Sequence, residues 1–254
     1  MRLAPLLVVF TVCSAFAQDT ADQVTSRSYR FTGPAPSARD YQELATVIRT
    51  VADAREVNID PDAVQITFSG RVEAPEMSEW LLRQLDKAPG ARPSETPEFH
   101  SARKDDNVAV FYLAHATGPR YIQEMITALR VVGDVQKIFS YSARNALAVR
   151  GPAAQIALTK WMVESMDKAA PIAVTKPPEF HITGVWDDNV RVYCLANARG
   201  AEDISRIITA VRLTGGIQKT FAVTENGALA IRGRIEDMVK AEGILLSMEQ
   251  QLAR

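Results

Sequence analysis

An internal repeat constrains this chain more than any other feature of its sequence. The stretch from Asn107 to Lys168 recurs without a gap from Asn189 to Gln250, at a constant spacing of about 82 residues. Each copy opens with an apolar segment, NVAVFYLAHA or NVRVYCLANA, and contains a second one further on, ALAVRG or ALAIRG. Self-similarity at a fixed period indicates that one supersecondary unit is used several times.

A fainter copy precedes these two at a spacing of about 81 residues. In this alignment Arg49, Arg130 and Arg212 coincide, and so do Trp80 and Trp161. The sequence therefore predicts three tandem modules. Modules 1, 2 and 3 are predicted to cover residues 28–87, 105–168 and 187–254.

Two stretches rich in proline and charge, residues 88–104 and 169–186, separate the predicted modules. Clusters of this composition between periodic segments are typical of linkers. We therefore expect modules 2 and 3 each to fold alone, as units that keep their own cores.

The hydrophobic periodicity predicts the same element order in each module. In module 2, apolar residues on both faces of Val108–Leu113 indicate a strand covered on two sides. A stripe at helical spacing follows, then two strands at 135–141 and 146–149, and a closing amphipathic helix. Gly133 is expected to end the first helix in a left-handed conformation. The prediction is an α+β fold of three two-layer modules, each strand–helix–strand–strand–helix, with a three-stranded sheet covered by two helices on one face.

The N-terminus has the pattern of a secretory signal peptide. Arg2 is followed by the apolar stretch Leu3–Phe16, and the small residues Ala15 and Ala17 flank a cleavage position. Residues 1–17 are therefore predicted to be removed and the rest exported to the periplasm. No later stretch reaches the roughly 18 apolar residues of a membrane span, so no transmembrane segment is expected.

Charge and motif content argue against nucleic acid as a partner. The chain has 29 Lys and Arg against 30 Asp and Glu, and its net charge is −1. Nucleic-acid binding normally requires a concentrated basic surface. The element order is KH-like, but the GxxG loop with which KH modules clamp RNA is absent from the sequence.

The duplicated tripeptide EFH suggests a metal site at first sight. Glu98, His100, Glu179 and His181 could supply ligands, but zinc needs three or four groups converging with tight geometry. The two copies are far apart in predicted linkers, so the pattern favours a short strand that pairs identically with each following module. We expect no metal and no cofactor.

No combination of residues indicates catalysis. Cys194, the sole cysteine beyond the signal peptide, lies in an apolar strand and is expected to be buried rather than reactive. No Ser-His-Asp, Cys-His or paired-carboxylate set stands out. The sequence therefore predicts a protein that is not an enzyme.

The pattern NVRVYCLANARGAEDISRIITAVR, followed by IQKTFAVTENGALAIRG and a helix ending in Ser-Met-Glu, resembles the secretin N-terminal short domain. Module 2 is similar, and module 1 is more divergent. These are the ring-building modules of secretins in type II and type III secretion and type IV pilus systems. A secretin continues into a membrane barrel, so a chain that ends at Arg254 is expected not to form the pore itself.

The resemblance implies a non-enzymatic periplasmic scaffold or assembly module that acts by protein–protein contact. Its expected partners are proteins of the cell envelope, such as a secretin or a second copy of this chain. A periplasmic binding module for a peptide or cell-wall ligand is the alternative, and a hydrolase with an unrecognised site is a further one.

Two sets of residues are candidates for contact with partners. Assigning Val108 and Val110 to the helix-covered face of the first strand leaves Phe111, Leu113, Tyr193 and Leu195 on the open face, where apolar groups normally mark a contact. The second set is polar and recurs between modules, as either a contact surface or ordinary solvated residues. It comprises Arg130, Gln136, Lys137, Arg212, Gln218 and Lys219.

Overall fold

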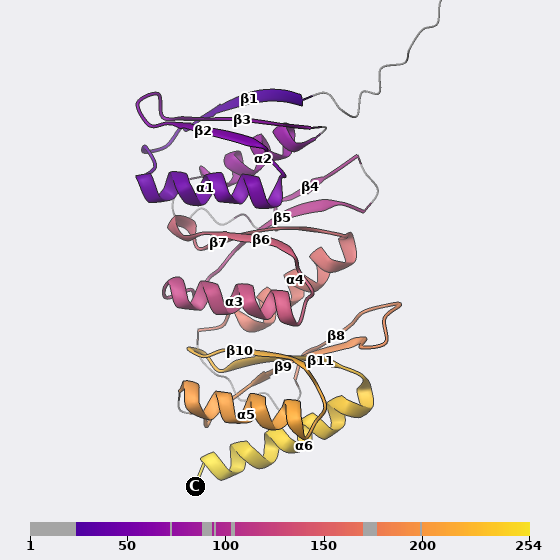
Figure 1. Cartoon of the computed structure of the whole chain (residues 1–254). Coiled ribbons are helices and arrows are strands. Elements are labelled where there is room, and N and C mark those ends of the chain that lie inside the picture. Colours follow the sequence, from indigo (N-terminus) through magenta and orange to yellow (C-terminus); the bar gives the residue numbers. More distant parts are fainter. Residues whose placement is uncertain are drawn as a thin grey trace, which may run out of the picture.

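The computed structural model describes residues 24–71, 73–87, 93, 95–102, 105–169, 177–198 and 200–254. The predicted signal peptide, residues 1–17, lies outside the described residues, as do parts of both predicted linkers. The three modules are stacked one on another in sequence order, so that layers of sheet and helix alternate along the stack (Figure 1). The predicted α+β fold of tandem two-layer modules is confirmed.

Module 1 contains a three-stranded antiparallel sheet in the order β1-β3-β2, with both helices on one face (Figure 1). Its first strand begins before the predicted start of the module at residue 28. The elements are β1 (Val24–Arg30), α1 (Ala38–Val51), β2 (Glu56–Asp60), β3 (Gln65–Arg71) and α2 (Ala74–Leu85).

Modules 2 and 3 repeat this order with one added strand each. Module 2 consists of β4 (Glu98–His100), β5 (Asn107–Tyr112), α3 (Pro119–Val131), β6 (Lys137–Tyr141), the 3₁₀ turn η2 (Ser142–Arg144), β7 (Ala146–Gly151) and α4 (Ala153–Met166). Module 3 consists of β8 (Glu179–His181), β9 (Asn189–Cys194), α5 (Ala201–Leu213), β10 (Lys219–Val223), β11 (Ala228–Gly233) and α6 (Ile235–Leu252).

The added strands β4 and β8 are the duplicated EFH tripeptides. Each pairs antiparallel with the first long strand of the following module, Phe99 opposite Val108 and Phe180 opposite Val190. The predicted pairing of these tripeptides is confirmed. The prediction of three strands per sheet is wrong for modules 2 and 3, whose sheets have the orders β4-β5-β7-β6 and β10-β11-β9-β8.

A capping box begins α1, and a left-handed residue follows the first helix of each module. Ser37 and Asp40 form a capping box, since the Asp40 amide donates to Ser37 Oγ at 3.2 Å and the Ser37 amide donates to Asp40 Oδ2 at 3.0 Å. After the helix the chain adopts a left-handed conformation at Asp53, Asp134 and Gly216. The prediction that Gly133 takes this conformation is wrong. Position 133 requires glycine for a different reason, because an added Cβ would lie 2.7 Å from the carbonyl oxygen of Leu129.

The open face of each later sheet is covered by the helices of the module before it. Val108 and Val110 share one apolar cluster with Val47 and Val51 of α1. Val190 and Val192 belong in the same way to a cluster formed mainly by module 2. Burial of this apolar surface joins the modules along the stack, because each of these two clusters contains residues of two modules. That modules 2 and 3 each fold alone stays a prediction.

The assignment of strand faces made from the sequence is therefore reversed. Phe111 is 4% exposed and Leu113 is 1% exposed, and both lie in the cluster that includes α3 and α4 of their own module. Tyr193 and Leu195 likewise pack against the core of module 3. Strand alternation separates the two sets of side chains correctly, but both sets are apolar because both faces of the sheet are covered.

Candidate interaction surfaces

An aspartate at the end of α1 connects module 1 to module 2. Asp53, in the left-handed position, accepts from Lys137 Nζ at 2.6 Å and from Arg150 Nη1 at 2.9 Å. Arg150 also donates to the carbonyl oxygen of Val51 at 3.0 Å and forms an ion pair with Asp106 at 2.7 Å. The hydrogen bond and charge of Asp106, opposed by burial of the guanidinium, raise the pKa of Arg150.

The same arrangement recurs between modules 2 and 3. Asp134 accepts from Lys219 Nζ at 2.6 Å and from Arg232 Nη1 at 2.8 Å, and Arg232 reaches the carbonyl oxygen of Val132 at 3.1 Å. Asp187 takes the place of Asp106 and pairs with Arg232 at 3.0 Å and with Lys219 at 2.9 Å. We call each of these two sets of residues a charge clamp.

The second charge clamp is buried more deeply than the first. The side chain of Arg232 is 5% exposed and that of Arg150 is 11% exposed. Burial alone would raise the pKa of Asp187, but the hydrogen bond from Lys219 and the charges of Arg232 and Lys219 lower it below its usual value. This aspartate therefore remains ionised inside the junction, where its partners offset the cost of desolvation.

A glutamate on the first helix adds a second polar contact to each junction. Glu43 of α1 accepts from the backbone amide of Ser142 at 2.7 Å, and Glu124 of α3 accepts from the amide of Thr224 at 2.7 Å. Each carboxylate thus satisfies a backbone donor in the turn after β6 or β10 of the following module.

A tryptophan on the closing helix completes each junction. Trp80 of α2 lies over Phe99 of β4, with ring centroids 5.8 Å apart. Trp161 of α4 lies over Phe180 of β8 at 5.5 Å. The coincidence of the two tryptophans in the sequence repeat therefore reflects a role in contact with the next module.

The recurring polar residues that the sequence singled out divide into two groups. Lys137 and Lys219 lie in the charge clamps. Arg130 and Arg212 stay within their modules, where they donate to strand carbonyl oxygens of Ile138 at 3.1 Å and Thr220 at 2.7 Å, as Arg49 does to Val57. The side chains of Gln136 and Gln218 donate to nearby carbonyl oxygens, those of Asp134 and Arg212.

Sequence reasoning missed the acidic half and the arginines of the charge clamps. Arg150 and Arg232 stand next to last in the segments ALAVRG and ALAIRG, in strands that are otherwise apolar. A repeated charge inside an apolar strand was the signal that could have found them, because such a charge needs a partner. Asp53 and Asp134 show no such signal, since isolated aspartates are common in loops.

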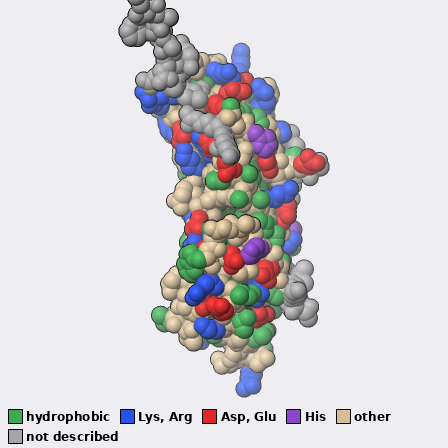
Figure 2. All heavy atoms as spheres, turned by 90° about the vertical axis from the view of Figure 1, so that its right-hand side faces the viewer, with side chains coloured by type: hydrophobic (Ala, Val, Ile, Leu, Met, Phe, Trp, Pro, Cys, Tyr) green, Lys and Arg blue, Asp and Glu red, His purple; other side chains and the backbone are tan. Residues whose placement is uncertain are grey.

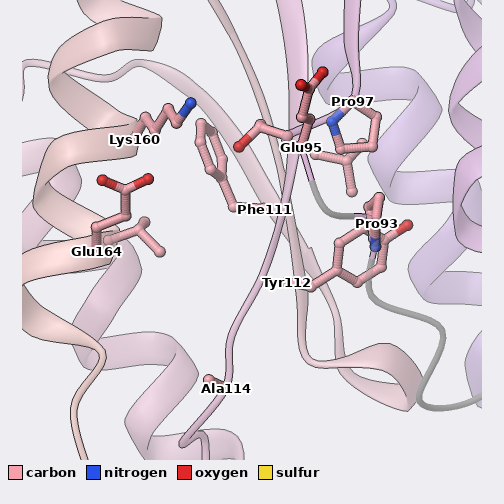
Figure 3. Close-up of a pocket in the computed structure, with 11 residues that line it drawn as sticks. Pro93, Glu95, Pro97, Phe111, Tyr112, Ala114, Lys160 and Glu164 are labelled. Atoms are coloured by element: carbon pink, nitrogen blue, oxygen red, sulfur yellow. The ribbon is translucent and has the colours of Figure 1, made fainter.

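Two grooves lie beside the first strands of modules 2 and 3. The first, of about 300 Å³, lies between α4 and β5 and is bordered by the charged side chains of Lys160, Glu164 and Glu95, with Phe111 and Tyr112 on the strand side (Figure 3). The second, of about 410 Å³, lies at the junction of modules 2 and 3. Its lining includes Trp161, Glu164, Lys168, Tyr193 and the partly exposed Cys194, which was expected to be buried.

Helix α6 exposes apolar side chains at positions where the other closing helices do not. Val239 is 62% exposed and Leu246 is 59% exposed. Counted from the equivalent carboxylates Asp86, Asp167 and Glu249, of which the first two cap their helices and the third lies in the last turn of α6, Glu76 and Arg83 stand at these positions in α2, and Ala157 and Glu164 in α4. Ile235 lies four residues before Val239 and is also exposed. The three side chains share one side of the helix, and we call them the α6 stripe.

The flank of the stack visible in Figure 2 has acidic and basic side chains interspersed. His100 contacts Asn107 at 2.9 Å and His181 lies 3.5 Å from Asp188, so each EFH histidine is engaged within its own hairpin. Across the described ranges, no group of three or more His, Cys, Asp or Glu side chains is placed to hold a metal ion. None of the helices in this part of the chain is both long and apolar enough to cross a membrane.

Comparison with protein families and with curated proteins finds no match. Among solved structures, the chain is similar to ExeD of Aeromonas hydrophila, with 16% identity over 90% of this chain and 41% of that one, at a TM-score of 0.21. It is also similar to the N-terminal domain of the secretin XcpQ from Pseudomonas aeruginosa, with 16% identity over 57% and 63% of the two chains, at a TM-score of 0.24. A chain of the ETEC pilotin–secretin AspS–GspD complex matches with 14% identity over 90% and 38%, at a TM-score of 0.22.

The solved structures that are similar to this chain thus include the N-terminal domain of a secretin and a chain of a pilotin–secretin complex. The chain spans 41% and 63% of the length of the first two structures. Identities and TM-scores this low assign the chain to no family.

Proposed function

We propose that this protein is a non-enzymatic scaffold of the periplasm that acts by protein–protein contact in envelope secretion or pilus machinery. The sequence resemblance to secretin N-terminal domains supports this role. The observation that carries it in the structure is the α6 stripe, which places Ile235, Val239 and Leu246 in solvent on one side of one helix, whereas the apolar sheet faces between the modules are buried. Exposed apolar side chains grouped on one element are typical of a contact with another protein.

The proposed partner is a protein of the cell envelope, such as a secretin or a pilus component. The polar residues shared by the modules are engaged within the chain, in the charge clamps and in helix–strand hydrogen bonds. Helix α6, which carries the stripe, lies at the C-terminal end of the stack (Figure 1), where the scaffold would hold the stripe at a fixed distance from module 1.

The test is site-specific photo-crosslinking from position 239 in intact cells, followed by capture of the chain from envelope extract. We expect an adduct of protein mass and recovery of a secretin or pilus component. The double substitution Val239→Ser with Leu246→Ser should abolish the capture. The matched control, Glu76→Ser with Arg83→Ser, changes the equivalent positions of α2 and should leave the capture intact. Capture that survives the α6 substitutions would contradict the proposal.

A second candidate function is favoured by the groove at the junction of modules 2 and 3. Its volume of about 410 Å³ falls in the range of small-ligand sites, and it combines the aromatic rings of Trp161 and Tyr193 with the charged side chains of Glu164 and Lys168. A cell-wall peptide or glycan fragment would suit such a lining. Calorimetric titration with purified muropeptides tests this alternative, and heat of binding that disappears in Trp161→Ala would support it.

A further inference from the structure

The stack has two ends, and neither presents the groups that join its modules. On the helix side, each internal junction uses a glutamate, a left-handed aspartate and a tryptophan. The equivalent positions of module 3 can be located by hydrogen bonds that recur in all three modules, because those bonds fix the register of the helices.

The first helices are aligned by the arginine that donates to a strand carbonyl eight residues later. Glu124 lies six residues before Arg130 in α3, and Arg206 lies six residues before Arg212 in α5. Arg206 is therefore the equivalent of Glu124. The side chain of Glu124 is 14% exposed, and that of Arg206 is 59% exposed. Charge is therefore inverted at the position that accepts the backbone amide of the next module.

The same register places Gly216 where modules 1 and 2 have Asp53 and Asp134. All three residues are left-handed, with φ values of 73°, 59° and 56°. Glycine adopts this conformation without strain, whereas an L side chain pays for it. At this position, modules 1 and 2 have an aspartate, whose carboxylate binds the lysine and arginine of the following module. Module 3, at the end of the stack, has a glycine.

The closing helices α4 and α6 are aligned by a carboxylate near their C-terminal ends, Asp167 after α4 and Glu249 in the last turn of α6. Asp167 accepts from the amide of His115 at 3.0 Å, and Glu249 accepts from the amide of Asn197 at 3.0 Å. Six residues before these carboxylates stand Trp161 and Gly243. A Cβ built on Gly243 meets nothing within 4 Å, so this position of α6 faces open space.

The other end of the stack lacks the complementary groups. In the sheet register, Lys137 pairs with Arg150 in module 2, and the equivalent pair in module 1 is Glu56 with Ser69. Phe139 opposite Ala148 is replaced by Asn58 opposite Thr67. The apolar side chains Val108 and Val110 are replaced by serines, Ser26 and Ser28. The open face of the first sheet is thus polar where the later sheets are apolar.

We infer that modules 1 and 3 are the two end caps of a closed stack, so that neither a fourth module nor a second copy of this chain adds along the stacking axis. A polar outer face on a terminal unit keeps stacked repeats soluble, and the open sheet face of module 1 is of this kind. Contacts between copies of this chain would then be made by the flank of the stack.

In the first experiment, the module 2 residues that contact module 3 are replaced by residues like those at the equivalent positions of module 3. The variant Glu124→Arg, Asp134→Gly, Trp161→Ala is compared with the unmodified chain by hydrogen exchange. Amides of β9–β11 should exchange at least about tenfold faster, because module 3 loses its support. Amides of β5–β7 are the internal control and should change little. If the triple variant does not fold, the pair Glu124→Arg with Asp134→Gly is measured instead and should show a smaller effect in the same direction. Unchanged exchange in β9–β11 would overturn the inference.

The second experiment asks whether the two ends ever meet. Two single-cysteine chains starting at Gln18 are made in a Cys194→Ser background, one with Thr67→Cys on the first sheet and one with Gly243→Cys on α6. After oxidation of the mixture, the yield of disulfide dimer should not exceed the yield from chains with randomly placed surface cysteines. Efficient joining of position 67 to position 243 would overturn the inference, whereas association through the flank would not bring these positions together.

Discussion

Arg232 donates to the backbone carbonyl oxygen of Val132, 100 residues earlier in the chain, at a distance of 3.1 Å. The same guanidinium pairs with Asp134 and Asp187. One side chain of β11 thus binds the C-terminal end of α3 and the strand hairpin of its own module together. Carbonyl oxygens at the end of a helix carry partial negative charge, so a cation there is favourable.

Replacing Arg232 by methionine should strongly destabilise the junction of modules 2 and 3. Asp187 would lose its partner inside the protein, and breaking a buried pair by removing one side costs about 3–5 kcal/mol. Urea unfolding followed by circular dichroism measures the change. Lys240→Met, at an exposed position of α6, is the control and should alter the free energy of unfolding by less than about 0.5 kcal/mol. Equal effects of the two substitutions would contradict a structural role for the clamp.

The charge clamps also predict a dependence on acid. The pKa of Asp187 is lowered in the folded protein, so its contribution to stability is present above the pKa of an unfolded aspartate and is lost as the pH falls through the folded value. The free energy of unfolding should therefore decrease below about pH 4. Asp187→Asn should be less stable at neutral pH and should show a shallower decrease between about pH 4 and pH 2. Parallel curves for the two proteins would be inconsistent with this account.

The buried tyrosines of the first junction predict a loss of stability at alkaline pH. Burial raises the pKa of Tyr112 and of Tyr141 to about 12. A raised pKa gives stability that is complete below the unfolded value near 10 and is lost as the pH rises through the folded value. Ultraviolet titration should show these two tyrosines ionising well above the ordinary pKa of a tyrosine, and Tyr141→Phe should remove one of these late groups. Ionisation of all tyrosines together near pH 10 would be the contrary result.

Phe111 should behave as a core residue. Its ring lies in the cluster of α3 and α4, so Phe111→Ala is expected to cost about 3–5 kcal/mol of unfolding free energy. Thermal unfolding of the full chain measures this loss. Trp186→Ala removes a larger ring from an exposed position and should change stability little. A Phe111 variant that unfolds like the parent chain, yet binds its partners less well, would restore the face assignment made from the sequence.

The element order could be predicted from the sequence because each long strand and helix has its own period. Which face of β5 or β9 is covered by the helices of its own module could not be predicted. Val108 and Phe111 are both apolar and buried, and strand alternation does not show on which face the helices lie. Strands β4 and β8 have only three residues each, too few for a periodic signal, and the duplicated EFH was the sole indication of them.

The junctions were harder to predict than the modules. Trp80 and Trp161 were visible as a coincidence of the repeat, but their partners Phe99 and Phe180 lie in segments with the composition of a linker. Asp53 acts through a left-handed backbone and through residues nearly a hundred positions away. Such contacts depend on how modules are stacked, which local patterns do not encode.

The two junctions use interchangeable parts. The helix side of module 1 presents Glu43, Asp53 and Trp80, the same three residue types that module 2 presents to module 3 through Glu124, Asp134 and Trp161. A chain shortened by one whole period, from residue 88 to residue 168, would bring module 1 against a sheet that already has the matching lysine, arginine and phenylalanine. The length of the scaffold is therefore adjustable in steps of one module, by deletion or duplication of the middle unit, without redesign of either end.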